Sequence, residues 1–468
     1  MRAYATALAA SLIALCALVT GAAQSPRRSV ALVVVGGTVI TENASHQILT
    51  PGAVAIDGTD IVDVGSPSAI GERYAAAETI EARDQVILPG LINTHTHAPM
   101  VMFRGLADDL ALMDWLQHYI FPAEAKTVSP EFVRVGTRLA ALEMIESGTT
   151  TYADMYYFEE EIAKATRDAG LRGVLGETII QFPVADAKTP AEGLARAERF
   201  IQTFRHDSLI TPAVAPHALY TNDRATLVAC AELGRKYQVP VIVHLAETED
   251  EVKLAAEQYH STPTQYLESI GFWGPRTLAA HGVWVNDEDI QILKRHGVGV
   301  SHNPESNMKL ASGTAPVTKY LTAGVALGLG TDGAASNNDL DMFEAMRQAS
   351  FLAKHANHDP TAVPAQTALD LATIGGARAL GMEKAIGSLE KGKRADLIAV
   401  SMDSARQTPL YNPVSHLVYV TRGDDVRTTI VNGKILMKDR RLRTLDRAAV
   451  IADANALAGK VRAAVQRQ

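Results

Sequence analysis

The amino-acid sequence predicts an α/β fold, namely a TIM (β/α)8 barrel with a small β-sandwich domain built from both flanks of the chain. Short β runs broken by glycine and aspartate lie near both ends, and between them apolar strands alternate with helical patterns, as in parallel βα units. Eight such strands are expected, the number that a TIM barrel needs. A doubly wound open sheet is the alternative. The predicted strands are 85–97, 149–157, 172–180, 210–218, 239–247, 277–285, 297–304 and 325–334.

The flanking β runs define the domain organisation. One set lies within 30–64 and the other within 386–437, where 386–389 is read as the first strand of its set. The predicted segments are a leader at 1–23, the first half of the sandwich at 28–88, the barrel at 89–385, the second half of the sandwich at 386–440 and a C-terminal helical segment at 441–468. Helices are expected at 130–147, 159–170, 223–237, 262–270 and 287–296.

Composition excludes several classes of protein. Hydrophobic residues make up 47% of the 468 residues and charged residues 21%, which is typical of a globular chain and excludes wholesale disorder. The net charge of −8 argues against a nucleic-acid or anionic-membrane binder, because these need a basic face. Two cysteines exclude a disulfide scaffold and a multi-cysteine zinc module.

The N-terminus has the pattern of a secretory signal peptide. Arg2 precedes an apolar run at 5–19, and small residues then lead to Gln24, which predicts cleavage after Ala23. The mature protein is therefore expected to be periplasmic or secreted, with no stable membrane insertion after cleavage. An uncleaved anchor or a misplaced start of the chain is the alternative.

Histidines gather at the C-terminal ends of the predicted strands. The chain has 14 histidines, and a random scatter would not favour one end of the strands, which is the end where TIM barrels build their active sites. The histidines at these ends are His95, His97, His217, His244, His281 and His302, and Asp332 ends the eighth strand.

Four of these strand-end residues form a predicted metal site. His95 and His97 are two apart on a strand, so both side chains point the same way. With His244 as a third nitrogen ligand and Asp332 as an oxygen ligand, the set suits one Zn²⁺ per subunit and leaves a position for water. Fe²⁺ or Mn²⁺ would also fit. Taken separately, His244 could be a core histidine, and Asp332 could cap a helix or a turn.

Glu247 follows the fifth strand, three residues after His244. A carboxylate beside a metal-activated water can transfer protons, so Glu247 is a catalytic candidate. The alternative is an acidic surface residue, since four carboxylates lie within 247–251. His302 and Asn303, on the loop after the seventh strand, are candidates for substrate binding, although a polar loop is the simpler interpretation.

The motifs together resemble the amidohydrolase superfamily. Within it they are similar to the branch that holds 5-methylthioadenosine/S-adenosylhomocysteine deaminases and triazine chlorohydrolases. The resemblance covers about residues 30–440. It is carried by PGLINTHTH at 89–97, SGTTT at 147–151, PHALYT at 216–221, HLAET at 244–248, HG at 281–282, SHNP at 301–304 and GTDG at 330–333.

The resemblance implies roles for the strand-end residues. It implies that His95, His97, His244 and Asp332 bind a single metal ion, and that His281 contacts the hydrolytic water and the substrate. It also implies that Glu247 moves a proton to a ring nitrogen of the substrate. It further implies that His217 touches the substrate. Asp332 is also a catalytic candidate, as acceptor of the water's proton, and His281 is one because it orients the water and stabilises the developing oxyanion.

Three residues are candidates for substrate recognition. Asp114 and Trp115 follow the first barrel strand, and Arg172 starts the third. The deaminases have a glutamate at the position that matches Asp114, and this glutamate grips the ribose hydroxyls. Asp114 is one methylene shorter, and it could instead be a solvated carboxylate on a helix. Trp115 could stack on a base, although an aromatic residue at helical spacing also suits the core. Arg172, at the start of the third strand, is a candidate for binding a substrate tail.

The predicted function is metal-dependent hydrolytic deamination of an aminated heterocycle, with an adenine nucleoside as the substrate and ammonia as a product. Adenosine, 5′-methylthioadenosine and S-adenosylhomocysteine are the expected substrates. The alternative is a deaminase or chlorohydrolase of a guanine, pterin or s-triazine ring on the same site. A catalytically silent metal-binding protein would need neither Glu247 nor His281. The resemblance is also compatible with a homo-oligomer.

Overall fold

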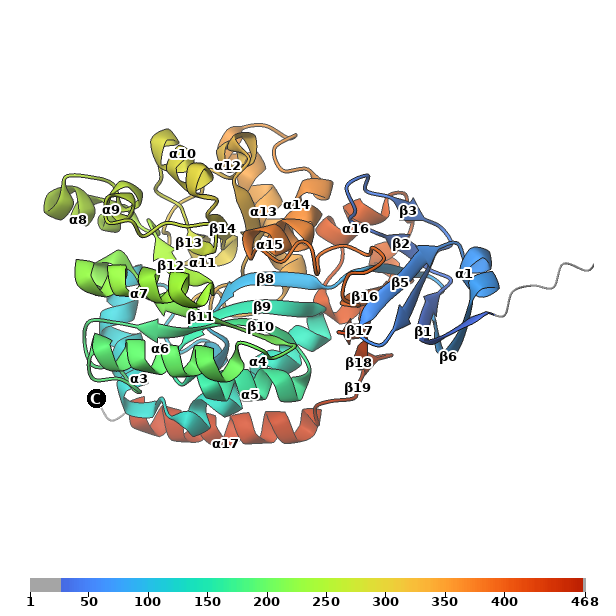
Figure 1. The fold of residues 1–468 in the computed structure, drawn as a ribbon, viewed down its shortest axis with the longest axis horizontal. Helices are drawn as coiled ribbons and strands as arrows, with labels where there is room; N and C mark the ends of the chain where they lie inside the picture. The colour runs from blue at the N-terminus through green and yellow to red at the C-terminus, as the bar shows by residue number, and fades with distance from the viewer. Residues whose placement is uncertain (1–26, 466–468) are drawn as a thin grey trace, which may run out of the picture.

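The computed structural model describes residues 27–465, so the predicted leader at 1–23 lies outside the described residues. Figure 1 shows a barrel of strands enclosed by helices and, beside it, a domain made of β-sheets. The predicted fold class is confirmed, because eight parallel strands form a nearly closed barrel and both flanks of the chain supply the other two sheets. Among the described residues, no helix is long and apolar enough to cross a membrane.

The barrel strands pair in sequence order, each parallel to the next. At the seam between the last and the first strand, the backbone N–H of Asp332 donates to the carbonyl of His95 at 2.9 Å. Most strand residues are buried on both faces, as the continuous apolar runs predicted. The strands are β8 (Leu91–Thr96), β9 (Thr149–Tyr156), β10 (Arg172–Ile179), β11 (Ile210–Pro216), β12 (Val241–Leu245), β13 (Thr277–His281), β14 (Gly299–His302) and β15 (Ala326–Leu329).

Helices surround the barrel and follow its strands. The five expected helices are present to within one residue at each end. They are α4 (Pro130–Ser147), α5 (Glu159–Ala169), α7 (Arg224–Tyr237), α9 (Pro263–Ser269) and α10 (Asp287–His296). The others are α6 (Pro190–Phe204), α8 (Glu249–Tyr259), α11 (Pro304–Lys309), α12 (Val317–Ala323), α13 (Met342–Asn357), α14 (Ala365–Ala372), α15 (Ile374–Ala379) and the short turn η3 (Leu219–Thr221).

The connection after β8 carries several short helices in place of one long one. Its last helices cover the mouth of the barrel, and η2 is a π-helical turn, a feature that is frequent at functional sites. The elements are η1 (Ala98–Phe103), α2 (Leu112–Trp115), η2 (Leu116–Ile120) and α3 (Phe121–Thr127).

The sandwich domain consists of two sheets packed face to face. One has the order β5-β4-β1-β6, and the other has the order β19-β18-β17-β16-β7-β2-β3, which mixes strands from both flanks. Apolar side chains such as Val34, Ile56, Ile87 and Leu397 fill the space between the sheets. The strands are β1 (Arg28–Val35), β2 (Thr38–Ile40), β3 (Ile48–Leu49), β4 (Ala53–Asp57), β5 (Asp60–Gly65), β6 (Tyr74–Glu81), β7 (Gln85–Pro89), β16 (Leu397–Ser401), β17 (Val426–Val431), β18 (Lys434–Lys438) and β19 (Arg441–Leu442).

Short helices and one long C-terminal helix complete the described chain. The long helix, α17 (Arg447–Val465), packs along the barrel against α3 and α4 (Figure 1). It buries Val450, Ala454, Leu457 and Val461, which recur every three or four residues. The short helices are α1 (Pro67–Arg73), η4 (Ala405–Gln407), α16 (Pro413–Tyr419) and η5 (Gly423–Asp425).

Two of the predicted strands need correction, and strand β6 was not predicted. The expected strand 85–97 is two strands in different sheets, β7 and β8, because the chain changes sheets at Gly90. A Cβ at Gly90 would lie 2.1 Å from the side chain of Thr150, so only glycine fits there. The run 386–389 is not a strand, and a single backbone bond from Leu389 to Thr41 ties it to the sandwich. Strand β6 was missed because it is rich in alanine and half exposed.

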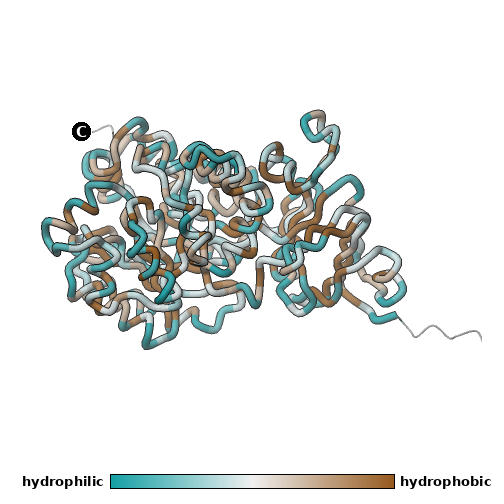
Figure 2. The backbone as a smooth tube through the Cα atoms, turned by 90° about the horizontal axis from the view of Figure 1, so that it is seen from above, coloured by the Kyte–Doolittle hydropathy of each residue, from teal (hydrophilic) through white to brown (hydrophobic). Residues whose placement is uncertain are grey.

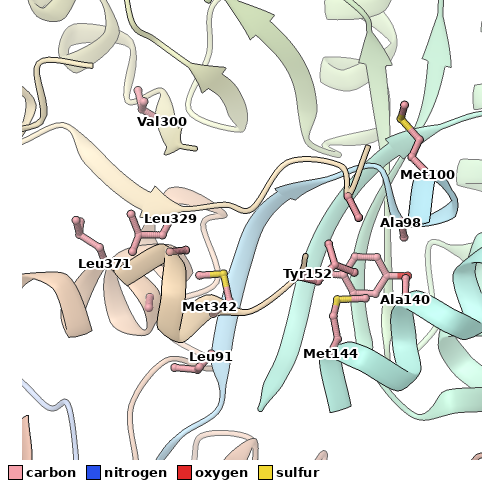
Figure 3. Close-up of a cluster of buried hydrophobic side chains, with 14 of the residues drawn as sticks. Leu91, Ala98, Met100, Ala140, Met144, Tyr152, Val300, Leu329, Met342 and Leu371 are labelled. Carbon is pink, nitrogen blue, oxygen red and sulfur yellow. The ribbon is translucent and has the colours of Figure 1, made fainter. Parts of the chain in front are cut away.

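The main hydrophobic core lies between the barrel strands and their helices. Figure 3 shows part of it, where Tyr152 of β9 and Met144 of α4 lie near Leu91 of β8. In Figure 2 the hydrophobic segments run through the interior of both parts of the molecule, whereas hydrophilic segments occupy outer loops. This packing holds β8 and its neighbours in fixed positions, and their C-terminal ends carry the candidate site.

Candidate active site

The four predicted metal ligands meet at the C-terminal end of the barrel. One ligand atom of each of His95, His97 and His244 lies within 4.8 Å of the other two. Nε2 of His97 is 3.3 Å from Nε2 of His244. Oδ1 of Asp332 is 3.4 Å from Nε2 of His95 and 3.4 Å from Nε2 of His97. The strand-end positions have therefore placed three imidazoles and one carboxylate around a single point.

Backbone carbonyls orient two of these rings. Nδ1 of His97 lies 2.6 Å from the carbonyl oxygen of Met155, and Nδ1 of His244 lies 2.7 Å from the carbonyl oxygen of His217. Because a carbonyl only accepts hydrogen bonds, each Nδ1 carries the proton and each Nε2 presents a lone pair. Two lone pairs facing each other at 3.3 Å repel unless a cation lies between them.

The ring of His95 gives the clearest indication of a metal. It is 1% exposed, and neither of its nitrogens has a hydrogen-bond partner in the described part of the chain, which is rare for buried polar atoms. Burial lowers its pKa to about 4, which keeps the neutral form that binds metals. Ligands at about 2.0–2.1 Å from a tetrahedral ion are about 3.3–3.4 Å apart. The residues present therefore fit a divalent ion.

Asp332 is held rigidly on both of its oxygens. Oδ2 accepts hydrogen bonds from Ser306 at 2.7 Å and Ser336 at 2.9 Å, and Oδ1 accepts one from the backbone N–H of Gly333 at 2.7 Å. The last bond is the turn contact that the sequence analysis weighed as an alternative, so Asp332 does both. Burial alone would raise the pKa of Asp332, but the neighbouring imidazoles, with His95 first among them, hold it well below its usual value.

Glu247 and His281 form a second pair beside the metal ligands. Nε2 of His281 lies 3.7 Å from Oε2 of Glu247, and Nδ1 of His281 lies 2.9 Å from Oδ1 of Asn307. Burial raises the pKa of Glu247. Burial opposes protonation of His281, but the charges of Glu247 and Asp332 outweigh it and raise its pKa. The pair is therefore placed to hold and release a proton beside the metal ligands.

The backbone around Glu247 is strained and well supported. Ala246 has φ of 46°, a left-handed conformation that is unfavourable for alanine and is typical of functional sites. The carboxylate of Glu251 accepts the backbone N–H of Glu247 at 3.0 Å. Ser312 lies 3.5 Å from Oε1 of Glu247. These contacts turn Glu247 into the site, whereas Glu249 and Asp250 point to solvent.

A cavity opens from the metal ligands and Glu247, and such concave, mostly apolar sites with a few polar groups are typical of small-molecule binding. His217 and Trp115 line it, as expected of substrate-binding residues. The ring of His217 is neutral, because burial and the neighbouring imidazoles lower its pKa to about 3. Apolar side chains make up most of the remaining wall, including Met100, Leu112, Leu116, Ile120, Phe121, Met155 and Leu310.

Asp114 does not reach this cavity, which corrects its assignment to the substrate. Its side chain is 67% exposed, and it lines a separate outer depression with Glu249, Asp250 and Trp284. Asp114 and Trp115 are adjacent on α2, so their side chains leave the helix about 100° apart. With Trp115 facing the cavity, Asp114 faces solvent.

Glu124 occupies the place that Asp114 was expected to fill. It lies on α3, lines the cavity and is 6% exposed. Its carboxylate accepts hydrogen bonds from Tyr156 at 2.7 Å and Tyr157 at 3.4 Å. Burial raises its pKa to about 7, against the effect of the two hydroxyls. The sequence offered one signal for Glu124, because it is the single carboxylate in the otherwise apolar run 119–125 that follows Trp115.

His302 and Asn303 are buried behind the cavity and do not line it. Asn303 lies close to His281, with Nδ2 3.4 Å from Nδ1, and Ser301 donates to its Oδ1 at 3.0 Å. Nδ1 of His302 has no hydrogen-bond partner among the described residues. The two residues were expected to bind substrate because they follow β14, but α11 starts at once and turns them into the core.

Arg172 lies at the opposite end of the barrel, so it cannot bind a substrate tail. It starts β10, and the site lies at the ends of the strands. Its guanidinium is 6% exposed and forms a two-pronged ion pair with Asp396, at 2.9 and 3.2 Å. It also donates to the carbonyl of Ser208 at 3.1 Å. The residue links the base of the barrel to the sandwich.

We expect Arg172→Ala to destabilise the protein and to leave substrate binding unchanged. Removing one partner of a buried ion pair leaves the other charge unpaired and costs about 3–5 kcal/mol. Denaturant unfolding would measure the loss, and the KM of the folded variant should equal that of the parent. The exposed Arg199, replaced by alanine, is the matched control. A raised KM with unchanged stability would restore the original assignment.

The chain is similar in sequence to known proteins. The model of the family described as "Amidohydrolase family" matches residues 86–436. A 5-methylthioadenosine/S-adenosylhomocysteine deaminase of Syntrophus aciditrophicus is 46% identical over 92% of this chain and 97% of its own length. A 5′-deoxyadenosine deaminase of Methanosarcina barkeri is 46% identical over 89% and 96%.

Solved structures are similar as well. A crystal structure of an adenosine deaminase from Xanthomonas campestris with bound zinc has a TM-score of 0.92 and 40% identity, and the match covers 94% of this chain and 100% of that one. A triazine hydrolase from Arthrobacter aurescens has a TM-score of 0.85 over 91% of this chain and 99% of its own, at 24% identity, and shares the fold.

Proposed function

Because this chain belongs to the amidohydrolase family, we propose that it is a metal-dependent deaminase of adenine nucleosides that releases ammonia. One observation carries the proposal. Three imidazoles and Asp332 surround a single point at tetrahedral spacing, and the Glu247–His281 pair lies beside them at the end of an otherwise apolar cavity. The curated relatives act on adenine nucleosides by their names, which agrees with such a site.

The residues of the site divide the chemistry among them. A divalent ion bound by His95, His97, His244 and Asp332 would lower the pKa of a water molecule toward neutrality. Glu247 holds a proton and delivers it to the ring nitrogen next to the amine-bearing carbon. His281 donates a hydrogen bond to the oxygen that becomes negative during attack. Asp332 accepts the second proton of the attacking water and passes it to the amine. The bond between carbon and the amine then breaks, so ammonia leaves and a carbonyl remains on the ring.

The cavity positions the rest of the substrate. The heterocycle lies between Glu247 and His217, because both side chains line the cavity beside the metal ligands. Trp115 supplies an aromatic wall on which it can stack. Glu124, which already accepts hydrogen bonds from Tyr156 and Tyr157, is the carboxylate placed to accept hydrogen bonds from the hydroxyls of a ribose. Zinc is proposed as the ion, since three nitrogens and one carboxylate at these spacings suit it, and the similar adenosine deaminase holds zinc.

A substrate screen with a Glu124→Gln variant tests the function. Metal-loaded enzyme should release ammonia from adenosine, 5′-deoxyadenosine or 5′-methylthioadenosine. Losing a charged hydrogen-bond acceptor should raise the KM for these nucleosides about 10–100-fold, while any activity on free adenine, which has no ribose, stays unchanged. Exposed Glu131→Gln is the control. Turnover of guanine or a chlorotriazine alone would overturn the nucleoside assignment.

We also propose that the protein is exported with its leader removed. The support is the pattern of Arg2, the apolar run at 5–19 and the small residues up to Ala23. Mass spectrometry of protein from the periplasmic fraction should find a chain that begins at Gln24. Recovery of an intact N-terminus from the cytoplasm would contradict export.

A further inference from the structure

We propose that this enzyme selects adenine nucleosides with an uncharged 5′ substituent and discriminates against those whose 5′ substituent carries a carboxylate or a phosphate. The inference rests on the proposed function, because it takes a nucleoside as the substrate. It narrows that function, since the expected substrates include S-adenosylhomocysteine, which ends in an amino acid, as well as 5′-methylthioadenosine, which ends in a thioether.

The first observation is the composition of the inner wall. Beyond the metal ligands, the cavity is lined mostly by apolar side chains. Leu112, Leu116 and Ile120 recur every four residues along α2 and η2, so one continuous apolar face points into the cavity. Leu310 lies on the wall from the other side of the barrel mouth. No lysine or arginine lines the cavity in the part of the chain that the structure describes.

The second observation is an acidic depression that adjoins the cavity, which we call the vestibule. It shares Leu112 and Leu310 with the cavity, and its charged side chains are Asp114, Glu249 and Asp250. All three carboxylates are more than half exposed. None of the described residues that line the vestibule is a lysine or an arginine.

The basic side chains beside the vestibule are already paired. Lys253 of α8 lies 2.9 Å from Glu249 and 3.5 Å from Asp250. Nδ1 of His118 lies 3.7 Å from Asp114. These contacts reduce the negative charge without offering an anion a free partner. The vestibule therefore keeps a net negative charge in front of an uncharged wall.

The two observations act in the same direction on an anionic tail. The deep end of the cavity holds the heterocycle, so the 5′ substituent extends along the apolar wall toward the vestibule. A phosphate there loses hydration without gaining a counter-charge, and the vestibule carboxylates repel it. The amino-acid tail of S-adenosylhomocysteine has no net charge, so it is disfavoured by the loss of hydration along the apolar wall and not by repulsion. A methyl or methylthio group instead buries apolar surface, which is favourable.

Steady-state kinetics of the parent enzyme on nucleosides with different 5′ substituents tests the proposal. For metal-loaded enzyme, kcat/KM should be highest for 5′-deoxyadenosine and 5′-methylthioadenosine, about 10–100-fold lower for S-adenosylhomocysteine and more than about 1,000-fold lower for adenosine 5′-monophosphate. Equal kcat/KM for the thioether and the amino-acid substrate would overturn the inference and leave the nucleoside deaminase intact. If no nucleoside is deaminated, both the function and the inference fail.

Charge reversal in the vestibule makes the test specific to its carboxylates. Asp114→Lys should raise kcat/KM for adenosine 5′-monophosphate about 3–10-fold at low ionic strength, and the gain should shrink as salt is added. S-Adenosylhomocysteine, whose tail has no net charge, should respond less. 5′-Deoxyadenosine, which is uncharged, reports any general damage. Glu72→Lys, the same change on α1 in the sandwich, is the matched control. An equal gain in the control, or none in Asp114→Lys, would overturn the part assigned to the vestibule.

Discussion

Replacing Glu247 with glutamine is expected to lower kcat about 100- to 10,000-fold while the metal remains bound. Glutamine has nearly the same shape and keeps the contact with Ser312, but it cannot carry a proton to the ring nitrogen. Glu247 is not among the four metal ligands, so the metal content should not change. Steady-state kinetics together with metal analysis of the same preparation would measure both quantities.

The pH profile adds a second readout for Glu247. Burial raises the pKa of this carboxyl. Because Glu247 must hold a proton to deliver it, kcat of the parent enzyme should fall as the pH rises through this pKa. The variant should lack that fall in kcat. Glu257→Gln, on an exposed turn of α8, is the matched control. Turnover of Glu247→Gln within about threefold of the parent would show that another group transfers the proton.

Removing the metal ion should abolish activity and destabilise the fold. Without a cation, Nε2 of His97 and Nε2 of His244 face each other at 3.3 Å, and neither nitrogen of the buried His95 ring has a hydrogen-bond partner within residues 27–465. A ligand at about 1,000 times its Kd stabilises the folded state by about 4 kcal/mol, so the chelated protein should melt several degrees lower. Calorimetry and an ammonia assay would follow the two effects.

A ligand variant separates metal loss from other effects of chelation. His244→Ala removes one of the three imidazoles, and it should reproduce the loss of activity and prevent recovery when Zn²⁺ is returned. The exposed His206, replaced by alanine, should behave as the parent does. Zn²⁺ should restore the chelated parent, and Mg²⁺, which prefers oxygen ligands, should not. Full activity in metal-free protein would refute the metal-dependent function.

The metal ligands could be predicted from the sequence because a parallel barrel gathers the ends of its strands in one place. Residues as far apart as His95 and Asp332 then become neighbours once each is known to end a strand. The i,i+2 spacing of His95 and His97 adds the side-chain direction. The order of the barrel strands follows the chain, so no long-range pairing had to be guessed.

The substrate residues were less predictable, because their direction depends on local turns. Arg172 was predicted at the start of the third strand, and the start of a barrel strand lies away from the active-site end, so its position already argued against substrate binding. Asp114 and Trp115 are neighbours in sequence, yet one faces solvent and the other the cavity. Glu124 was missed because a π-helical turn and the start of α3 intervene between it and Trp115.

The sequence by itself determined the barrel, the flanking sandwich and the positions that could bind a metal. These depend on repeating patterns of apolar residues and on strand ends, which are local signals. Only the tertiary structure decided which carboxylate lines the cavity, which charges surround its mouth and which arginine holds the domains together. Those outcomes depend on how helices rotate and pack over the barrel, and packing is set by side chains that are distant in the sequence.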